Sequence, residues 1–433
     1  MDYKKVIQEF SRIKSVKGEL ILPGDKSISH RAIIFSALAE GISRVKNLSS
    51  AEDVNTTKEI FSALGTEYDI HNDELLIKGK GLFAFKKPLT ELNSGNSGTS
   101  ARLITAILGA QKFDSIIIGD ESLSKRPMKR VTNPLQKMGM NLTLSNDNYL
   151  PLKISAISKL NPISYRLEVA SAQAKSAVLI AGLFIDDITE VIETIPTRNH
   201  TELMLGLPIV NSEGGIIIQS SSKFIPKPQK IFVPSDISTA SFFIVLTLLM
   251  KDSELIIKNV SLNPSRTGIL EVLKKMGGNI TIVSQSESCG ELLGDLLVKS
   301  SELFNIEIPK EIIPNIIDEI PILTIAGIFA NGKFKVSDCK ELRVKESDRI
   351  KSMVYNLRQF GLTVAEYEDG FEFESKELLQ NEIVTFESFG DHRIAMAFSI
   401  FSLLLEQGGK INNFDCVKIS NPQFIEQIKN IIG

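Results

Sequence analysis

Hydrophobic and polar positions follow a repeated arrangement along the chain. Six times, a turn of small and polar residues leads into an apolar run of about fifteen residues, as in GDKSISHRAIIFSALAEG at Gly24–Gly41. Ser, Thr, Asp and Asn before an apolar run are signals for the start of a helix. The sequence therefore predicts six apolar helices, which begin near Lys26, Asn96, Ala172, Asp236, Asp318 and Asp391.

Further elements follow each predicted apolar helix in the same order. A short strand comes next, as in SIIIGD, ELIIKNV and KFKVSD, because alternation with a period of two and β-branched residues mark strands. In most copies a second, more amphipathic helix then ends at a glycine before another strand, as in ALGTEYDI, KMGMNLTL, KMGGNITI and QFGLTVAEY. We therefore expect an α/β protein built from six repeats of roughly 70 residues.

The six repeats are expected to form two groups of three. The stretch 219–236, QSSSKFIPKPQKIFVPSD, lies between the third and fourth repeats and has the composition of a linker, although surface loops share that composition. If the units of each half share one orientation, two facing halves aim six helix N-termini at one cleft. A helix N-terminus presents free N–H groups and the positive end of a dipole, so this cleft would suit small, highly anionic ligands.

Composition narrows the class of protein. The 433 residues are too many for one ordinary core, and the net charge of −3 argues against a general nucleic-acid binder. The three cysteines lie far apart and show no metal-ligand spacing, so we expect no zinc, no disulfide framework and a reducing, cytoplasmic location. The N-terminal segment lacks the apolar region of a secretory signal, and the apolar runs are too short to span a bilayer.

The openings of the first two repeats carry candidate anion-binding groups. Lys26, Ser27 and Arg31 form either a solvated helix start with a serine cap or part of an anion site, and the nucleotide P-loop spacing is absent. The stretch 93–99, NSGNSGT, is equally consistent with a plain turn and with a loop whose backbone N–H groups approach a ligand. Arg102, just inside the second helix, is either a site cation or a surface residue.

Cations recur in loops at equivalent positions of the repeats. These loops are KRPMKR at 125–130, TRNHTE at 197–202, PSRTG at 264–268 and RVKESDR at 343–349. A charge run alone is usually a solvated surface. The recurrence of cations after a strand in equivalent loops nevertheless favours contact with a ligand.

Carboxylates that could transfer protons occur chiefly in the fifth and sixth repeats. Glu346 lies between two cations, and Asp318 opens the fifth apolar helix, where a simple N-cap is the alternative. Asp391, His392 and Arg393 open the sixth, and a lone histidine is more often structural than catalytic. Together, the repeated cations and these carboxylates suggest an enzyme for two phosphorylated or carboxylated small molecules, with Asp318 and Glu346 as acid and base.

Eight short motifs in this order resemble the 3-phosphoshikimate 1-carboxyvinyltransferase family, also called EPSP synthases. They are GDKSISHRA, NSGNSGTSAR, GDESLSKRPM, SAQAKSA, TRNHTE, IIDEIP, RVKESDR and GDHRIAMA. The resemblance runs from about residue 15 to the C-terminus. It implies the enolpyruvyl transferase fold, an inside-out α/β barrel of two similar domains with three βαβαββ units each. Domain I would comprise residues 1–22 and 235–433, domain II residues 23–234, with hinges near 22–24 and 233–236.

The resemblance also implies a reaction. The 5-hydroxyl of shikimate 3-phosphate attacks C2 of phosphoenolpyruvate while C3 gains a proton, and the tetrahedral intermediate then loses a C3 proton and phosphate. No metal or organic cofactor is implied. The partners would be these two small molecules, with no nucleic acid and no membrane, and the protein would be a monomer and a target of glyphosate.

The family's site residues can be carried onto matching positions. Asp318 would be the base near the 5-hydroxyl, Glu346 would serve C3, and Lys26 would lie between both substrates. The residues implied to bind shikimate 3-phosphate are Lys26, Ser27, Arg31, Ser171, Ala172, Gln173, Arg198, Asp318 and Lys345. Those implied to bind phosphoenolpyruvate are Lys26, Gly98, Arg126, Gln173, Arg349, Arg393 and Lys418. Arginine suits these anions because its planar fork binds phosphate and carboxylate through two hydrogen bonds.

The sequence departs from one common version of the family at four positions. Ala172 replaces a serine, Arg198 stands where that version has serine, Lys175 follows the glutamine, and Leu103 stands where proline is frequent. These features resemble the family's second class, which is often less inhibited by glyphosate, although Gly98 retains room for the inhibitor.

Two other hypotheses stay open. UDP-N-acetylglucosamine enolpyruvyl transferase shares the architecture, but typically carries a reactive cysteine in a loop that here reads GDESLSKRP and has none. A non-catalytic anion-binding protein on the same scaffold is the other alternative. The pairing of Asp318 and Glu346 with the cations argues against it.

Overall fold

The computed structural model describes residues 6–375, 380 and 382–432, and their contacts form two compact units. The first unit comprises Met1–Pro23, Ser235–Ser286 and Leu292–Gly433, and the second comprises Gly24–Pro234 and Glu287–Glu291. The chain therefore passes between units after Pro23 and after Pro234, and again on either side of residues 287–291. Whether these positions act as hinges stays a prediction.

Residues 287–291 belong to the second unit, whereas the expected domain boundaries placed all of 235–433 in one domain. They form the tip of the hairpin between β16 (Asn279–Ser288) and β17 (Glu291–Lys299). Polar contacts with the second unit explain the difference: the Ser288 hydroxyl accepts from the Phe232 N–H over 3.0 Å, and Cys289 Sγ donates to Gln229 Oε1 over 2.7 Å.

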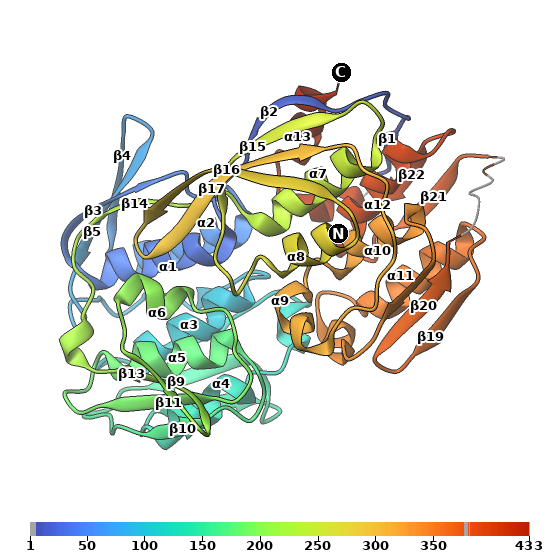
Figure 1. Cartoon of the computed structure of the whole chain (residues 1–433). Helices are drawn as coiled ribbons and strands as arrows, with labels where there is room; N and C mark the ends of the chain where they lie inside the picture. The colour runs from blue at the N-terminus through green and yellow to red at the C-terminus, as the bar shows by residue number, and fades with distance from the viewer. Residues whose placement is uncertain (1–5, 376–379, 381, 433) are drawn as a thin grey trace. The chain divides into compact units, whose positions relative to one another are not determined.

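The second unit contains three four-stranded sheets (Figure 1). In each, the first pair of strands is parallel and the others are antiparallel. The strand orders are β14 (Lys230–Phe232), β3 (Glu40–Lys46), β5 (Glu74–Lys80) and β4 (Glu67–His71); β6 (Leu92–Asn93), β7 (Ser115–Ile118), β9 (Tyr149–Ser155) and β8 (Asn141–Ser145); and β10 (Ser164–Arg166), β11 (Thr189–Glu193), β13 (Gly215–Ser220) and β12 (Ile209–Ser212).

Three apolar helices form the centre of the second unit, and three amphipathic helices complete its repeats. The apolar helices are α1 (Lys26–Leu38), α3 (Gly98–Leu108) and α5 (Ala172–Gly182). The amphipathic ones are α2 (Glu52–Ala63), α4 (Lys129–Lys137) and α6 (His200–Leu205). One continuous cluster of buried side chains joins these helices to the sheets. The sequence predicted this order of elements.

The first unit follows a related plan, but two of its three sheets have three described strands instead of four. Its strands and helices can be followed in Figure 1. Its strand orders are β16, β17, β15 (Glu254–Ser261) and β2 (Lys17–Ile21); β18 (Lys333–Val336), β20 (Gly370–Glu374) and β19 (Val364–Tyr367); and β1 (Gln8–Phe10), β22 (Gly409–Asn412) and β21 (Val384–Glu387). In the middle sheet, an isolated parallel bridge between Phe304 and Asn331 stands where the other repeats have a parallel strand.

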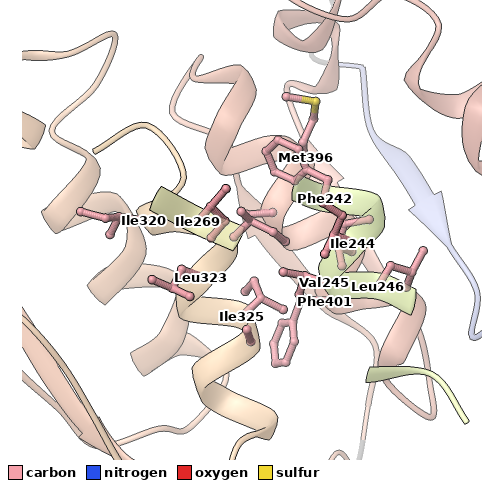
Figure 2. Packing of buried hydrophobic residues seen from close by; sticks show 14 of the residues in the cluster. Phe242, Ile244, Val245, Leu246, Ile269, Ile320, Leu323, Ile325, Met396 and Phe401 are labelled. Atoms are coloured by element: carbon pink, nitrogen blue, oxygen red, sulfur yellow. The ribbon is translucent and has the colours of Figure 1, made fainter. Parts of the chain in front are cut away.

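Buried helices also form the core of the first unit. They are α7 (Ile237–Leu249), α10 (Ile320–Phe329) and α12 (His392–Leu404), with α8 (Gly268–Lys275), α9 (Ile313–Ile316), α11 (Arg349–Gln359) and α13 (Phe424–Ile431) around them. Figure 2 shows side chains of this core, among them Phe242, Leu323 and Phe401 from the three buried helices. A helix that is apolar on all sides is stable in water only when it is covered in this way.

The predicted helix starts and stops are confirmed, with one exception. Asp25, Ser97, Ser171, Asp236 and Asp391 each cap an apolar helix through a side-chain oxygen. Asp318 does not cap α10, which begins at Ile320 after Glu319, so the simple N-cap alternative for Asp318 is wrong. Each glycine predicted to end an amphipathic helix has a positive φ, as at Gly139 (99°) and Gly361 (102°).

The six sheets remain open, each with three or four described strands. Within the described residues, no single helix is long and apolar enough to cross a membrane; only the bent pair Lys310–Ile316 and Ile320–Phe329, taken together, passes by length and composition. The expected facing of six helix N-termini across a cleft between domains stays a prediction.

Candidate functional site

In the first unit, predicted site residues from distant parts of the sequence meet at Arg349. Its side chain is 1% exposed at the start of α11. It donates through Nε to Asp391 Oδ2 over 2.8 Å, through Nη1 to Asp318 Oδ1 over 3.1 Å and through Nη2 to Glu346 Oε2 over 2.6 Å. The two carboxylates predicted to transfer protons therefore share one guanidinium.

The charges of this cluster favour a permanently ionised arginine. Burial by itself lowers the pKa of Arg349, but the carboxylates of Asp391, Glu346 and Asp318 outweigh burial and raise the pKa above its ordinary value. Lys345 adds a second cation, with Nζ 3.7 Å from Asp318 Oδ1. Because the Glu346 side chain is 24% exposed, its carboxylate remains within reach of a small molecule.

Arg393 is tied to the same cluster through the backbone and side chains around it. Its N–H donates to Asp391 Oδ1 over 2.8 Å at the start of α12. Its guanidinium donates through Nη1 to the Asp318 carbonyl over 3.0 Å, and the same nitrogen lies 3.7 Å from Glu319 Oε1. Asp391 therefore holds the two arginines of the first unit that are predicted to bind phosphoenolpyruvate, Arg349 by its side chain and Arg393 by its backbone.

Lys418 occupies a more exposed position than the other predicted residues of this unit. It lies on the 3-10 segment Phe414–Ile419, its side chain is 64% exposed, and Nζ is 2.6 Å from Asp415 Oδ1. Its assignment to phosphoenolpyruvate stays a prediction.

In the second unit, Lys26 is the first residue of α1 and forms an ion pair with Asp53. Nζ lies 3.0 Å from Asp53 Oδ2, and both side chains are largely buried. Asp53 is in the first turn of α2, where an acidic residue is also favourable to the helix dipole. Asp53 carries no distinguishing signal in the sequence, because an acidic residue is ordinary at a helix start.

Arg31 connects three helices of the second unit. Its guanidinium donates to Thr201 Oγ1 on α6 over 2.8 Å, to Ser176 Oγ on α5 over 2.8 Å and to the Ser27 carbonyl on α1 over 2.9 Å. Burial lowers its pKa to about 10, although the nearby acidic side chain of Glu202 raises it. An anion at Arg31 would therefore have to share donors that already hold helices together.

Gly98 begins α3 beside a hydrogen-bonded pair of side chains. Arg102 Nη1 donates to Gln173 Oε1 over 2.6 Å, and Gln173 Nε2 donates to Thr99 Oγ1 over 3.0 Å. A Cβ on Gly98 would come to 2.8 Å from Arg102 Nη1. The glycine therefore keeps space for the guanidinium that orients Gln173.

Arg126 belongs to the charged loop before α4. It donates through Nη2 to Asn96 Oδ1 over 2.8 Å and to Ser122 Oγ over 3.1 Å. The bond to Asn96 holds the KRPMKR loop against the Gly-rich loop that opens α3. This contact is consistent with the interpretation that cations in equivalent loops of the repeats contact a ligand.

The buried Lys175 lies near the start of the helix whose first residues are predicted to bind the phosphate of shikimate 3-phosphate. Ser171 caps α5, and Ala172 is the first residue of that helix. Lys175 Nζ is 2.8 Å from Glu193 Oε2 and 2.6 Å from Glu202 Oε1, with side-chain exposures of 3% or less.

The same network reaches the loop that carries Arg198. Lys175 Nζ donates to the Thr197 carbonyl over 3.4 Å, and the Thr197 hydroxyl donates to Glu193 Oε1. Burial raises the pKa of Glu193, and Lys175 opposes that rise. Lys175, which departs from one version of the family, therefore fixes the residue that precedes the half-buried Arg198.

Comparison with known proteins decides the family. The family model described as EPSP synthase (3-phosphoshikimate 1-carboxyvinyltransferase) matches residues 10–428. The chain belongs to the EPSP synthase family. A protein of Petrotoga mobilis named 3-phosphoshikimate 1-carboxyvinyltransferase is 45% identical over 98% of this chain and 99% of its own length. A protein of the same name from Alkaliphilus metalliredigens is 43% identical over 98% and 99%.

Solved structures agree with this membership of the EPSP synthase family. EPSP synthase from Acinetobacter baumannii is 38% identical and has a TM-score of 0.88, covering 99% of this chain and 98% of its own. The enolpyruvyl transferase NikO from Streptomyces tendae is 13% identical with a TM-score of 0.75, covering 99% and 97%, which shows a shared fold alone. The predicted enolpyruvyl transferase fold is therefore confirmed.

Proposed function

We propose that this member of the EPSP synthase family transfers the enolpyruvyl group of phosphoenolpyruvate to the 5-hydroxyl of shikimate 3-phosphate and releases phosphate. The observation that carries the proposal is the shared contact of Asp318 and Glu346 with Arg349. Two carboxylates beside a buried cation provide a proton acceptor, a proton donor and a charge for an anionic substrate.

The proposed chemistry has two steps. Asp318 takes the proton of the 5-hydroxyl as the 5-oxygen bonds to C2 of phosphoenolpyruvate, and Glu346 in its protonated form delivers its proton to C3, which becomes a methyl group. Glu346 then removes a proton from that methyl group, the double bond re-forms, and the C2–O bond to phosphate breaks. Lys26 stabilises the departing phosphate by its positive charge, and the phosphate takes up the proton that Asp318 accepted from the 5-hydroxyl. Atoms and charges balance without a metal or organic cofactor, so we expect a chelator such as EDTA to leave turnover unchanged.

We assign the shikimate 3-phosphate contacts to the second unit, with Lys345 and Asp318 added from the first. The assigned residues of the second unit are Lys26, Ser27, Arg31, Ser171, Ala172, Gln173 and Arg198. The Ser171 cap supports the assignment because the start of α5 presents backbone N–H groups near a side chain hydroxyl. Ala172 lacks a hydroxyl, so only its backbone could contact the phosphate.

We assign phosphoenolpyruvate to arginines of both units together with Lys26, Gly98, Gln173 and Lys418. Arg349, Arg393 and Arg126 each present a planar guanidinium suited to a phosphate or carboxylate. Two like-charged substrates repel each other, and fixing them among these cations offsets that repulsion while orienting the reacting atoms.

Nuclear magnetic resonance of the reaction in heavy water tests both the product and the mechanism. We expect inorganic phosphate, a shikimate product with a vinyl group on its 5-oxygen, and deuterium in that vinyl group, because C3 passes through a methyl stage. A vinyl product without deuterium would contradict addition and elimination. Absence of both product and phosphate would contradict the proposed function.

The location and the oligomeric state of the protein are two further proposals. We propose a cytoplasmic monomer that meets its substrates by diffusion. The three cysteines, Cys289, Cys339 and Cys416, are free in the structure, which supports a reducing compartment. Light scattering of the purified protein at several concentrations tests the monomer.

A further inference from the structure

The loop at 264–268, one of the four cationic loops of the repeats, has no assigned contact with either substrate. Its arginine, Arg266, is 2% exposed and lies in the first unit between β15 and α8. Nη2 donates to Ser238 Oγ over 2.5 Å and lies 3.7 Å from Asp236 Oδ1 and 3.9 Å from Glu319 Oε1. Arg266 is therefore directed at carboxylates of its own unit.

Glu319 is the carboxylate that links Arg266 to the predicted site. It is fully buried, follows Asp318 in the chain and immediately precedes α10. The Ser238 hydroxyl donates to Glu319 Oε1. Arg266 Nη2 and Arg393 Nη1 lie 3.9 Å and 3.7 Å from the same oxygen. A buried carboxylate is costly unless it is paired, so these two guanidinium groups and the hydroxyl compensate the burial of the Glu319 carboxylate.

Arg393 depends on the Asp318–Glu319 dipeptide for its placement. Over the described part of the chain, its guanidinium contacts that dipeptide through Nη1, which bonds the Asp318 carbonyl over 3.0 Å and lies near Glu319 Oε1. The loop around Arg266 is itself fixed, because the Asn263 carbonyl accepts the Arg266 N–H over 2.8 Å. Arg266, Glu319 and Arg393 thus form a continuous row of buried charged side chains.

We propose that Arg266 and Glu319 are positioning residues that set the guanidinium of Arg393. The proposal rests on the proposed function, in which Arg393 binds phosphoenolpyruvate. Without the negative charge of Glu319, Arg393 loses its ionic anchor, and the two arginines repel each other across a neutral amide. Phosphoenolpyruvate binding then weakens, while the shikimate 3-phosphate contacts in the second unit keep their geometry.

Steady-state kinetics of Glu319→Gln test this selectivity. We expect the KM for phosphoenolpyruvate to rise about tenfold or more, because Arg393 loses the buried ion pair that places its guanidinium, and the KM for shikimate 3-phosphate to stay within about twofold. Arg266→Lys keeps the charge but loses the planar fork, so its effect should be smaller and of the same kind. Glu271→Gln is the matched control, because Glu271 forms an exposed ion pair with Lys275 on α8 in the same unit. It should leave both KM values unchanged.

A crystal structure of Glu319→Gln separates this proposal from the proposed function. We expect the Arg393 guanidinium to leave the Asp318 carbonyl, whatever reaction the enzyme catalyses. If Glu319→Gln does not fold, Ser238→Ala removes the hydroxyl that donates to Glu319 and accepts from Arg266, and it should show the same KM pattern to a smaller degree.

Each result has one meaning. An unmoved Arg393, or equal changes in both KM values, would overturn the positioning role. A wild-type protein without transferase activity would refute the proposed function, while displacement of Arg393 in the variant would still support the structural part.

Discussion

Glu346 and Arg349 form a 2.6 Å ion pair one turn apart at the start of α11. Their relationship places a carboxylate assigned to proton transfer beside a guanidinium assigned to phosphoenolpyruvate. The same guanidinium bonds Asp318 and Asp391, so any change to one member alters the charge felt by the others.

Removing the charge of Glu346 should separate binding from chemistry. Glu346→Gln keeps the size of the side chain but not its proton affinity, so we expect turnover to fall by about 10²- to 10⁴-fold, the usual contribution of a general acid or base. The dissociation constant for shikimate 3-phosphate should change little. Calorimetry and steady-state kinetics measure the two quantities, and near-normal turnover would remove Glu346 from the mechanism.

Replacing Arg349 should destabilise the first unit. Arg349→Met leaves the fully buried Asp391 carboxylate without its guanidinium, and breaking a buried ion pair costs about 3–5 kcal/mol of unfolding free energy. Urea unfolding of the variant measures the loss. Lys340→Met is the control, because the Lys340–Glu368 pair is exposed and should contribute little to the free energy of unfolding. Equal losses in both variants would contradict the role of Arg349 in the cluster.

A methyl group at Gly98 should act through Arg102. In Gly98→Ala the new Cβ would lie 2.8 Å from Arg102 Nη1, so the guanidinium must shift and its bond to Gln173 Oε1 must weaken. A net hydrogen bond is worth about 1 kcal/mol, so we expect the KM for phosphoenolpyruvate to rise roughly fivefold. Arg102→Lys should give a rise of similar size. An unchanged KM in both variants would show that Gln173 does not need this support.

His30 should make the stability of the second unit depend on pH. Burial lowers its pKa from 6.5 to about 3, and Nδ1 lies 2.7 Å from the Thr57 hydroxyl. Below pH 6.5 the unfolded chain binds a proton that the folded chain excludes, so stability falls as the pH falls toward 3. Linkage gives a loss of about 2 kcal/mol between pH 7 and pH 5.

The pH effect can be assigned by comparing two histidines. His30→Gln should remove this part of the slope in urea unfolding, and His71→Gln, at an exposed position, should retain it. A slope that is unchanged in His30→Gln would contradict the assignment.

Local patterns predicted most of the fold. The six apolar helices and the glycines that end the amphipathic ones could be read from the sequence, because helix starts, periodicity and left-handed glycines are local properties. The tip at 287–291 could not, since its place depends on bonds from Ser288 and Cys289 to residues far away in the chain.

The candidate site was only partly predictable for the same reason. Asp318 and Glu346 were singled out by their neighbours, but nothing local indicates that both meet Arg349 or that Asp391 completes the cluster. Asp53 and Glu319 were missed because an acidic residue beside a helix start is common. Their partners, Lys26 and Arg393, identify them only in three dimensions.

Phosphate release from phosphoenolpyruvate with two alternative acceptors tests the proposed reaction most directly. With purified protein, we expect release when shikimate 3-phosphate is the acceptor and none when UDP-N-acetylglucosamine takes its place. Release with the nucleotide sugar alone would keep the fold and overturn the acceptor. Release with neither, under conditions in which a known EPSP synthase works, would contradict the proposed function and leave an anion-binding protein on this scaffold.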